Sequence, residues 1–190
     1  IMGAQDGVDI LIEAMADLVN RQGRRDIQCA IVGSGTELPN LQRLAAERGL
    51  DDFVTFTGFQ SGAQLMRLFS TFDIGVIPDP KNGYNDKISM NKHFEYMTLG
   101  VPFVQFDLVE GRRIAGDASL YASDNSPRDL AAQMMRLVDD PVLHADLAQR
   151  GTERAKALLR WESERTRLLA AYDLALSRGR PALASTTAAT

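Results

Sequence analysis

The sequence predicts an α/β protein with a Rossmann-like, doubly wound parallel sheet and C-terminal helices. Short apolar runs, such as residues 27–32 and Phe103–Phe106, alternate with stretches of helical periodicity. Most of these runs are mainly apolar and do not alternate with polar residues, which is typical of strands that are buried on both faces of a parallel sheet. The chain has 190 residues, 45% of them hydrophobic. This is enough for one domain with a sheet of about five or six strands.

Each element is predicted from its own local pattern. Apolar residues at helical spacing indicate the helices, and Ser126 with Pro127 marks a helix start. Ser89 is expected to cap the helix that begins at Met90 and Gly100 to end it, while residues 107–113 are expected to form a loop. We therefore predict strands at 27–32, 53–56, 73–78, 103–106 and 119–122, and helices at 8–20, 36–49, 63–72, 90–99, 126–138, 141–159 and from Trp161 onward.

Composition excludes several classes of function. The net charge of −4 argues against a protein that coats nucleic acid. The single cysteine, Cys29, rules out an internal disulfide and fits the cytoplasm. No apolar run approaches the roughly 18 residues of a membrane span. The two histidines, His93 and His144, lack metal-ligand spacing, so no metal site is expected.

The stretch from Asn85 to Pro102 is the main candidate site. It follows the predicted strand 73–78, and open α/β sheets bind ligands at the carboxyl ends of their strands. The free backbone N–H groups of a helix start, with Lys92 close by, suit a phosphate.

A second candidate is Gly33-Ser34-Gly35, which lies between a predicted strand and a helix. Gly33 and Gly35 would let a phosphate or sugar approach the backbone closely, although an ordinary tight turn explains them equally. Leu38 stands where a dinucleotide-binding fingerprint needs its third glycine, so that motif is excluded.

The central stretch resembles the signature of retaining GT-B glycosyltransferases of group 1 (family 4 type). Glu95-Tyr96-Met97-Thr98-Leu99-Gly100-Val101-Pro102 is similar to the second glutamate of their Glu-x7-Glu motif and the Ala-Met-Ala-x-Gly-x-Pro-Val that follows. The first glutamate falls at Lys87, which departs from the pattern. Residues 85–92 instead fit a variant, Asn-Asp-x-Ser-x-Met-Asn-Lys, of some members. Residues 32–38 and 56–59 resemble two further segments of the family.

The resemblance implies one half of a GT-B fold. Residues 1–178 would be the donor-binding domain, with its first strand truncated at the N-terminus. Residues 179–190 are mostly small and polar, and this composition predicts a flexible tail. The implied reaction moves a sugar from a nucleotide-diphosphate sugar to an acceptor hydroxyl with retained configuration, without a cofactor or metal, in polysaccharide biosynthesis. The acceptor, a glycan, lipid or small molecule, would bind the other half, so the fragment alone is expected to be inactive. Neither nucleic acid nor a transmembrane segment is implied, and the expected location is cytoplasmic, with membrane association through the other half left open.

The same resemblance assigns roles to individual residues. Glu95 would hold the nucleotide ribose, Lys92 would stabilise the leaving diphosphate, and Asp86 would bind the donor sugar. The family's arginine and lysine after its first strand fall at Ile1 and Asp6. Either Lys92, Lys87 or an arginine of the 110–113 segment replaces them, or the protein binds its donor differently. Lys92 and Asp86 are the expected catalytic residues, and the other expected donor contacts are Gly33, Gly35, Gly58, Phe59, Asn85, Ser89, Met90, Asn91 and Glu110.

Each assignment has an alternative. Glu95 and Lys92 lie three residues apart and could simply pair on a helix surface. Asn85 and Asp86 could form an ordinary turn with side-chain-to-backbone bonds, and Phe59 could be a core aromatic. A nucleotide-sugar epimerase of GT-B architecture and a non-catalytic nucleotide-binding module are the alternative functions.

Overall fold

The computed structural model describes residues 2–158 and 161–177. The chain divides into two compact units, Ile1–Lys156 and Ala157–Thr190. The first unit holds all the described strands, and helix α8 (Trp161–Ser177) belongs to the second. The predicted tail, 179–190, lies outside the described residues. No helix in the described ranges is long and apolar enough to cross a bilayer.

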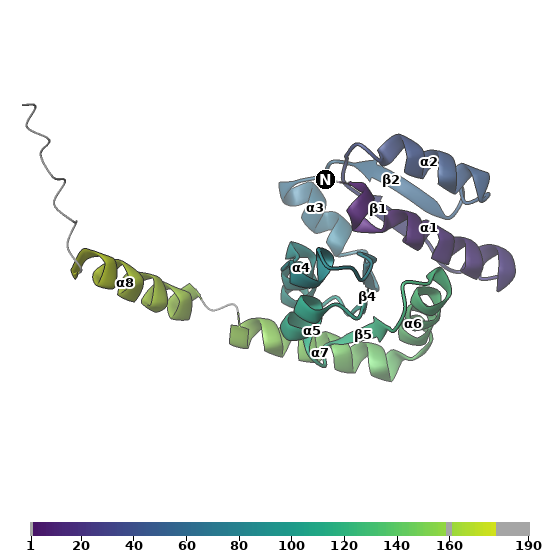
Figure 1. Cartoon of the computed structure of the whole chain (residues 1–190). Helices are drawn as coiled ribbons and strands as arrows, with labels where there is room; N and C mark the ends of the chain where they lie inside the picture. The colour runs from purple at the N-terminus through teal and green to yellow at the C-terminus, as the bar shows by residue number, and fades with distance from the viewer. Residues whose placement is uncertain (1, 159–160, 178–190) are drawn as a thin grey trace, which may run out of the picture. The chain divides into compact units, whose positions relative to one another are not determined.

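Strands and helices alternate along the first unit, as the sequence predicts (Figure 1). In chain order its elements are the 3₁₀ helix η1 (Ala4–Asp6), α1 (Val8–Ala16), the π-helix η2 (Asp17–Arg21), β1 (Cys29–Val32), α2 (Leu38–Glu47), β2 (Val54–Gly58), α3 (Gly62–Phe69), β3 (Gly75–Ile77), the 3₁₀ helix η3 (Asn85–Lys87), α4 (Asn91–Leu99), β4 (Phe103–Phe106), α5 (Val109–Ala115), β5 (Ser119–Ala122), α6 (Pro127–Asp139) and α7 (Pro141–Leu158).

All pairings among the described strands are parallel. β1 pairs with β2, and β3, β4 and β5 pair in that order, with Phe103 opposite Gly75 on one side and Ser119 on the other. Helices connect the successive strands, as parallel pairing requires. The predicted α/β, Rossmann-like architecture is therefore confirmed.

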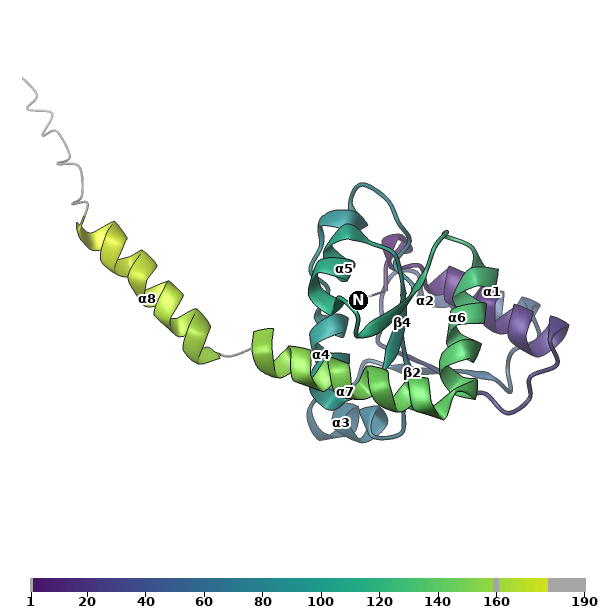
Figure 2. The ribbon, with the colours of Figure 1, turned by 90° about the horizontal axis from the view of Figure 1, so that it is seen from below.

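Strand β4 separates two parts of the core. Val104 and Phe106 belong to the larger cluster, which includes residues of α1 and α6. These two helices pack against each other (Figure 2). Phe103 belongs to the smaller cluster with Met97 of α4 and residues of α5. Because successive strand residues face opposite sides, Gln105 points to the same side as Phe103, toward α4.

Two local predictions were wrong. Residues 107–113 are not a loop, because α5 begins at Val109 and buries Ile114 and Ala115 in the smaller core cluster. The charged residues in its first turns concealed this apolar face. Ser89 does not cap α4: Met90 holds the N-cap position without a side-chain bond, and Ser89 donates its hydroxyl hydrogen to Glu110 instead.

Gly100 and Ser126 behave as predicted. Gly100 ends α4 in the left-handed conformation, with φ of 69°, and Ser126 Oγ accepts a hydrogen bond from Asp129 N at 3.1 Å.

Candidate functional site

The loops that follow β3, β4 and β5 are tied together at the carboxyl edge of the sheet. Lys81, after β3, donates from Nζ to the carbonyl of Asp107, after β4, at 2.8 Å. The backbone of Lys81 also exchanges two bonds with the amide of Asn125, after β5, at 2.7 and 3.0 Å. This edge is thus a connected scaffold, on which side chains from different strands can be held in fixed positions.

The N-terminal segment links this edge to β1. Met2 N donates to the carbonyl of Ser34 at 2.8 Å, just beyond β1. Gly7, with φ of 62°, packs so closely against β3 that an added Cβ would lie 2.0 Å from the carbonyl oxygen of Pro78. Residues 2–7 therefore run from the end of β1 to the end of β3 and place Asp6 near the central stretch.

Lys92 lies at the carboxyl edge, where the sequence predicts it. Its Nζ is 2.5 Å from Oδ2 of Asp79, the second residue after β3. The Asp79 side chain is 5% exposed and that of Lys92 is 35% exposed. Burial raises the pKa of Asp79, the neighbouring Lys92 ammonium opposes that rise, and the charge of Asp6 adds to it. At this edge, the partly exposed ammonium group of Lys92 is therefore paired with the buried carboxylate of Asp79.

Glu95 lies on α4, three residues beyond Lys92, and is exposed. The ion pair of Lys92 in the described part of the chain is with Asp79, so the alternative of a Lys92–Glu95 surface pair is not observed. The Glu95 carboxylate is thereby accessible to a ligand. Its role in holding a ribose stays a prediction.

Asn85 and Asp86 both make side-chain bonds to the backbone. Asn85 is 1% exposed, and its Nδ2 donates to the carbonyls of Gln5 at 3.1 Å and Pro80 at 2.8 Å. Asp86 Oδ1 accepts from Val109 N at 3.0 Å, at the start of α5. The bonds to Gln5 and Val109 reach distant parts of the chain, so they attach residues 85–87 to η1 and α5. The role of Asp86 in binding the donor sugar stays a prediction.

Glu110 is held by two donors. Ser89 Oγ donates to Glu110 Oε1 at 2.5 Å and Arg113 Nε to Oε2 at 2.7 Å. Both bonds lower the pKa of Glu110, which falls to about 2, and the bond from Arg113 has the larger effect. Arg112 bonds Asp107 at 2.6 Å and stacks 3.9 Å over the ring of Tyr121. Both arginines that could replace the family's basic residues are therefore already paired with carboxylates.

The two glycine segments meet at one place, since Gly33 N donates to the carbonyl of Gly58 at 2.9 Å. Both residues have positive φ, 132° and 68°. Gly35 allows close packing against the N-terminal segment, because an added Cβ would lie 2.2 Å from the carbonyl oxygen of Met2. Phe59 is 74% exposed, so it is not a core aromatic and its ring is open to a ligand.

Met90 and Asn91 differ in what they can offer a ligand. The Met90 side chain is buried in the smaller core cluster, so that side chain is not accessible to a ligand. Asn91 is exposed at the first position of α4. Lys87 is also exposed, in the last position of η3.

Sequence reasoning missed Asp79 and the buried pair of His93 and Gln105. His93 Nδ1 lies 3.1 Å from the Met90 carbonyl and Nε2 lies 2.8 Å from Gln105 Oε1, with both residues fully buried. Burial lowers the pKa of His93. Two signals could have revealed these residues: a carboxylate between two prolines directly after a strand, and a glutamine inside the apolar run Phe103–Phe106.

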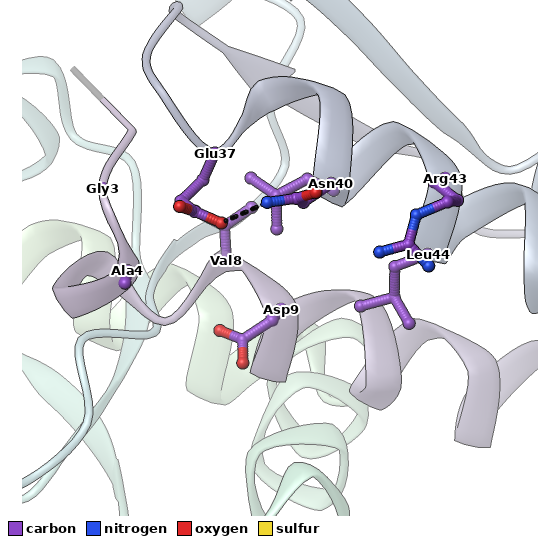
Figure 3. A pocket seen from close by; sticks show the side chains of 9 residues that line it. Gly3, Ala4, Val8, Asp9, Glu37, Asn40, Arg43 and Leu44 are labelled. Atoms are coloured by element: carbon purple, nitrogen blue, oxygen red, sulfur yellow. Dashed lines mark hydrogen bonds between the residues drawn. The ribbon is translucent and has the colours of Figure 1, made fainter.

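A pocket of about 230 Å³ lies elsewhere, between the start of α1 and helix α2 (Figure 3). Its charged side chains are Asp9, Glu37 and Arg43, and Glu37 accepts a bond from Asn40 at 3.0 Å. None of the residues predicted to bind a donor lines it. With two carboxylates and one guanidinium it does not favour a phosphate.

Comparison with known proteins gives a family and a fold. A family model described as "Glycosyl transferases group 1" matches residues 2–140. Alpha-D-kanosaminyltransferase of Streptomyces kanamyceticus is 31% identical over 150 residues, which cover 78% of this chain and 37% of that protein. The chain spans about two fifths of the length of the curated relatives it matches.

Two solved structures show the same fold. Sucrose-phosphate synthase from Thermosynechococcus elongatus superposes with a TM-score of 0.78 at 24% identity, covering 93% of this chain and 44% of that one. A mutant of TarM from S. aureus, in complex with fondaparinux, alpha-GlcNAc-glycerol and UDP, gives 0.77 at 19% identity, covering 88% and 33%.

Proposed function

Because the chain belongs to the group 1 glycosyltransferases, we propose that it is the donor-binding domain of an enzyme that transfers a sugar from a nucleotide sugar to an acceptor hydroxyl with retained anomeric configuration. The observation that carries this proposal is the position of Lys92 at the carboxyl edge, with the exposed Glu95 three residues further along α4. Helix α4 thus carries both a cation for a diphosphate, Lys92, and a hydrogen-bond acceptor for ribose hydroxyls, Glu95. The acceptor site belongs to the rest of the protein.

In this proposal the diphosphate lies beside Lys92 and the first backbone N–H groups of α4. When the glycosidic bond to the donor breaks, negative charge develops on that diphosphate, and a fixed cation stabilises it. The Glu95 carboxylate accepts two hydrogen bonds from the ribose diol. The exposed Phe59, at the end of β2, is available to stack on the base.

A titration with nucleotides tests the location of the site. UDP, GDP and ADP are added in turn to the chain while backbone amide NMR shifts are recorded. We expect the nucleotide with the matching base to shift residues 33–35, 58–59 and 89–95. Shifts confined to the Asp9–Arg43 pocket, or no saturable shift with any of the three, would contradict the proposal.

The substitution Glu95→Ala tests the ribose contact. A hydrogen bond to a charged acceptor contributes about 1.5–3 kcal/mol, so nucleotide affinity should fall by roughly tenfold or more. Glu162→Ala, which removes another helical glutamate from the start of α8, is the matched control and should leave affinity unchanged. In the full-length protein Glu95→Ala should also abolish sugar transfer.

A non-catalytic nucleotide-binding module is the second candidate. Lys87 in place of the first motif glutamate, together with the pairing of Arg112 and Arg113, favours it. The full-length protein decides between the two functions, because a binding module would bind nucleotide and transfer no sugar. An epimerase would release free nucleotide without an acceptor, whereas a transferase requires one.

A further inference from the structure

The contact between Lys92 and Asp79 raises a question about how the site binds an anion. A lysine that already neutralises a carboxylate has less positive charge to offer a second partner. Asp79 is 4% exposed, and Lys92 Nζ lies 2.5 Å from its Oδ2. A buried carboxylate that loses its cation is strongly disfavoured, so Lys92 cannot simply leave Asp79 for a phosphate.

Further negative charge lies on the same side. Asp6 belongs to η1, which the close packing of Gly7 against Pro78 brings beside the Asp79 loop. Among the described residues, Lys92 of α4 and Asp6 of η1 act on the pKa of Asp79. The charge of Asp79 in turn raises the pKa of His93 and of Tyr96 on α4. Burial favours neutral His93 and neutral Tyr96. One ammonium therefore balances two carboxylates before any ligand is present.

A diphosphate beside Lys92 would add more negative charge within a few ångströms of Asp79. Three anionic groups would then share one cation, and one of the three, Asp79, is buried. The least costly response is protonation of the most buried carboxylate, because a like charge and burial both disfavour its ionised form. The proton comes from solvent and converts the Asp79 carboxylate into a neutral acid. The positive charge of Lys92 then interacts with the diphosphate alone.

We propose that Asp79 is a positioning residue that holds Lys92 in the free protein and takes up a proton when a nucleotide diphosphate binds. This inference rests on the proposed function, since it concerns the same anion site. It makes donor binding dependent on pH through a residue outside the family's motif.

Calorimetry of the chain and of its Asp79→Asn variant tests the proposal. UDP, GDP and ADP are titrated in turn, at about pH 6 and about pH 8, in buffers of different protonation heat, which gives the number of protons bound per nucleotide. The terminal phosphate of these nucleotides also titrates, and its pKa in the complex depends on the charge of Asp79. Phosphorus NMR of the bound nucleotide therefore measures the protons that the phosphate takes up, and the remaining difference in proton number between the two proteins reports Asp79.

We expect the unmodified chain to take up more protons per nucleotide than Asp79→Asn. We also expect its affinity for the nucleotide to increase as the pH falls. At neutral pH and low salt, Asp79→Asn should bind roughly tenfold more tightly, because a like charge near the diphosphate is gone. Adding Lys92→Met to Asp79→Asn should remove that gain. Asp117→Asn, which changes an exposed carboxylate paired with Arg150, is the control and should match the unmodified chain.

Equal proton numbers in the chain and in Asp79→Asn, or weaker binding by the variant, would overturn the inference and leave the proposed function standing. If no nucleotide binds either protein, the proposed function fails first and this inference with it. Should Asp79→Asn not fold, Asp6→Asn serves instead, since it keeps the Lys92–Asp79 pair. It should then show a smaller proton uptake than the unmodified chain, and an equal uptake would overturn the inference.

Discussion

Lys92 supplies the positive charge of the candidate site, and its partner comes from a different element of the fold. Its position in the sequence suggests Glu95 as the partner, but the bond is made to Asp79, 13 residues earlier. The connection between β3 and α4 folds back so that the start of α4 lies beside the residues that directly follow β3. A polar residue that directly follows a buried strand can therefore belong to the site although no motif includes it.

Glu110 provides a prediction at the residue scale. Its pKa of about 2 lies below the ordinary value of 4.5, so its bonds to Arg113 and Ser89 stabilise the fold above about pH 4.5. That contribution is lost as the pH falls toward 2. We expect Glu110→Gln to be less stable than the unmodified chain near neutral pH, and the gap to close in acid.

Urea unfolding at about pH 6 and about pH 3 measures this effect. Glu153→Gln, which alters an exposed glutamate of α7, is the control and should show a smaller dependence on pH. A gap between Glu110→Gln and the unmodified chain that stays constant across this pH range would contradict the assignment.

At the scale of elements, α4 and α5 pack on β4 through a buried polar contact. His93 of α4 reaches Gln105 of β4, and Gly111 of α5 packs directly against them. An added Cβ at Gly111 would lie 2.4 Å from Gln105 Oε1 and 3.2 Å from His93 Nε2. Because Gln105 is fully buried, it cannot move aside without losing its bond to His93. The start of α4, which carries Lys92, thus depends on a glycine in a neighbouring helix.

We predict that Gly111→Ala destabilises the protein by about 1–3 kcal/mol, the usual cost of overpacking. This is opposite in sign to the gain of up to about 1 kcal/mol expected for glycine to alanine in an unobstructed helix. Thermal and urea unfolding measure the change. Gly83→Ala, at a position with no atom within 4 Å of the added Cβ, is the control.

A second substitution separates overpacking from other effects. Gln105→Ala removes the atom that the new methyl group would meet. The double variant Gly111→Ala/Gln105→Ala should therefore lose less stability than the sum of the two single changes. Strict additivity would show that the contact between Gly111 and Gln105 is not the cause.

At the scale of the whole molecule, the described strands form two separate parallel sets. Within these residues β1 pairs with β2 alone and β3 pairs with β4 alone, so each has one edge without a neighbouring strand. The segment 2–7 passes between the carboxyl ends of β1 and β3. A strand that paired with the open edges of β1 and β3 would lie between the two sets.

Hydrogen exchange can detect such a strand. Cys29 and Gly33 donate to the β2 side, so by alternation the amides of Ala30 and Val32 face the other edge. In this chain we expect Ala30 and Val32 to exchange faster than Ile31. In a full-length protein in which a preceding strand pairs with β1, all three should be similarly protected. Unchanged fast exchange of Ala30 and Val32 in that longer protein would contradict the expectation.

The sequence alone determined the parallel α/β architecture, because mainly apolar runs without alternation, such as Phe103–Phe106, are suited to burial on both faces. It also located α4 and its end at Gly100, since glycine adopts a left-handed conformation at little cost. Only the tertiary structure showed that α5 is a helix, that Ser89 bonds Glu110, and that Asp79 holds Lys92. These features depend on contacts between loops that meet at the edge of the sheet, and local sequence patterns do not encode such distances.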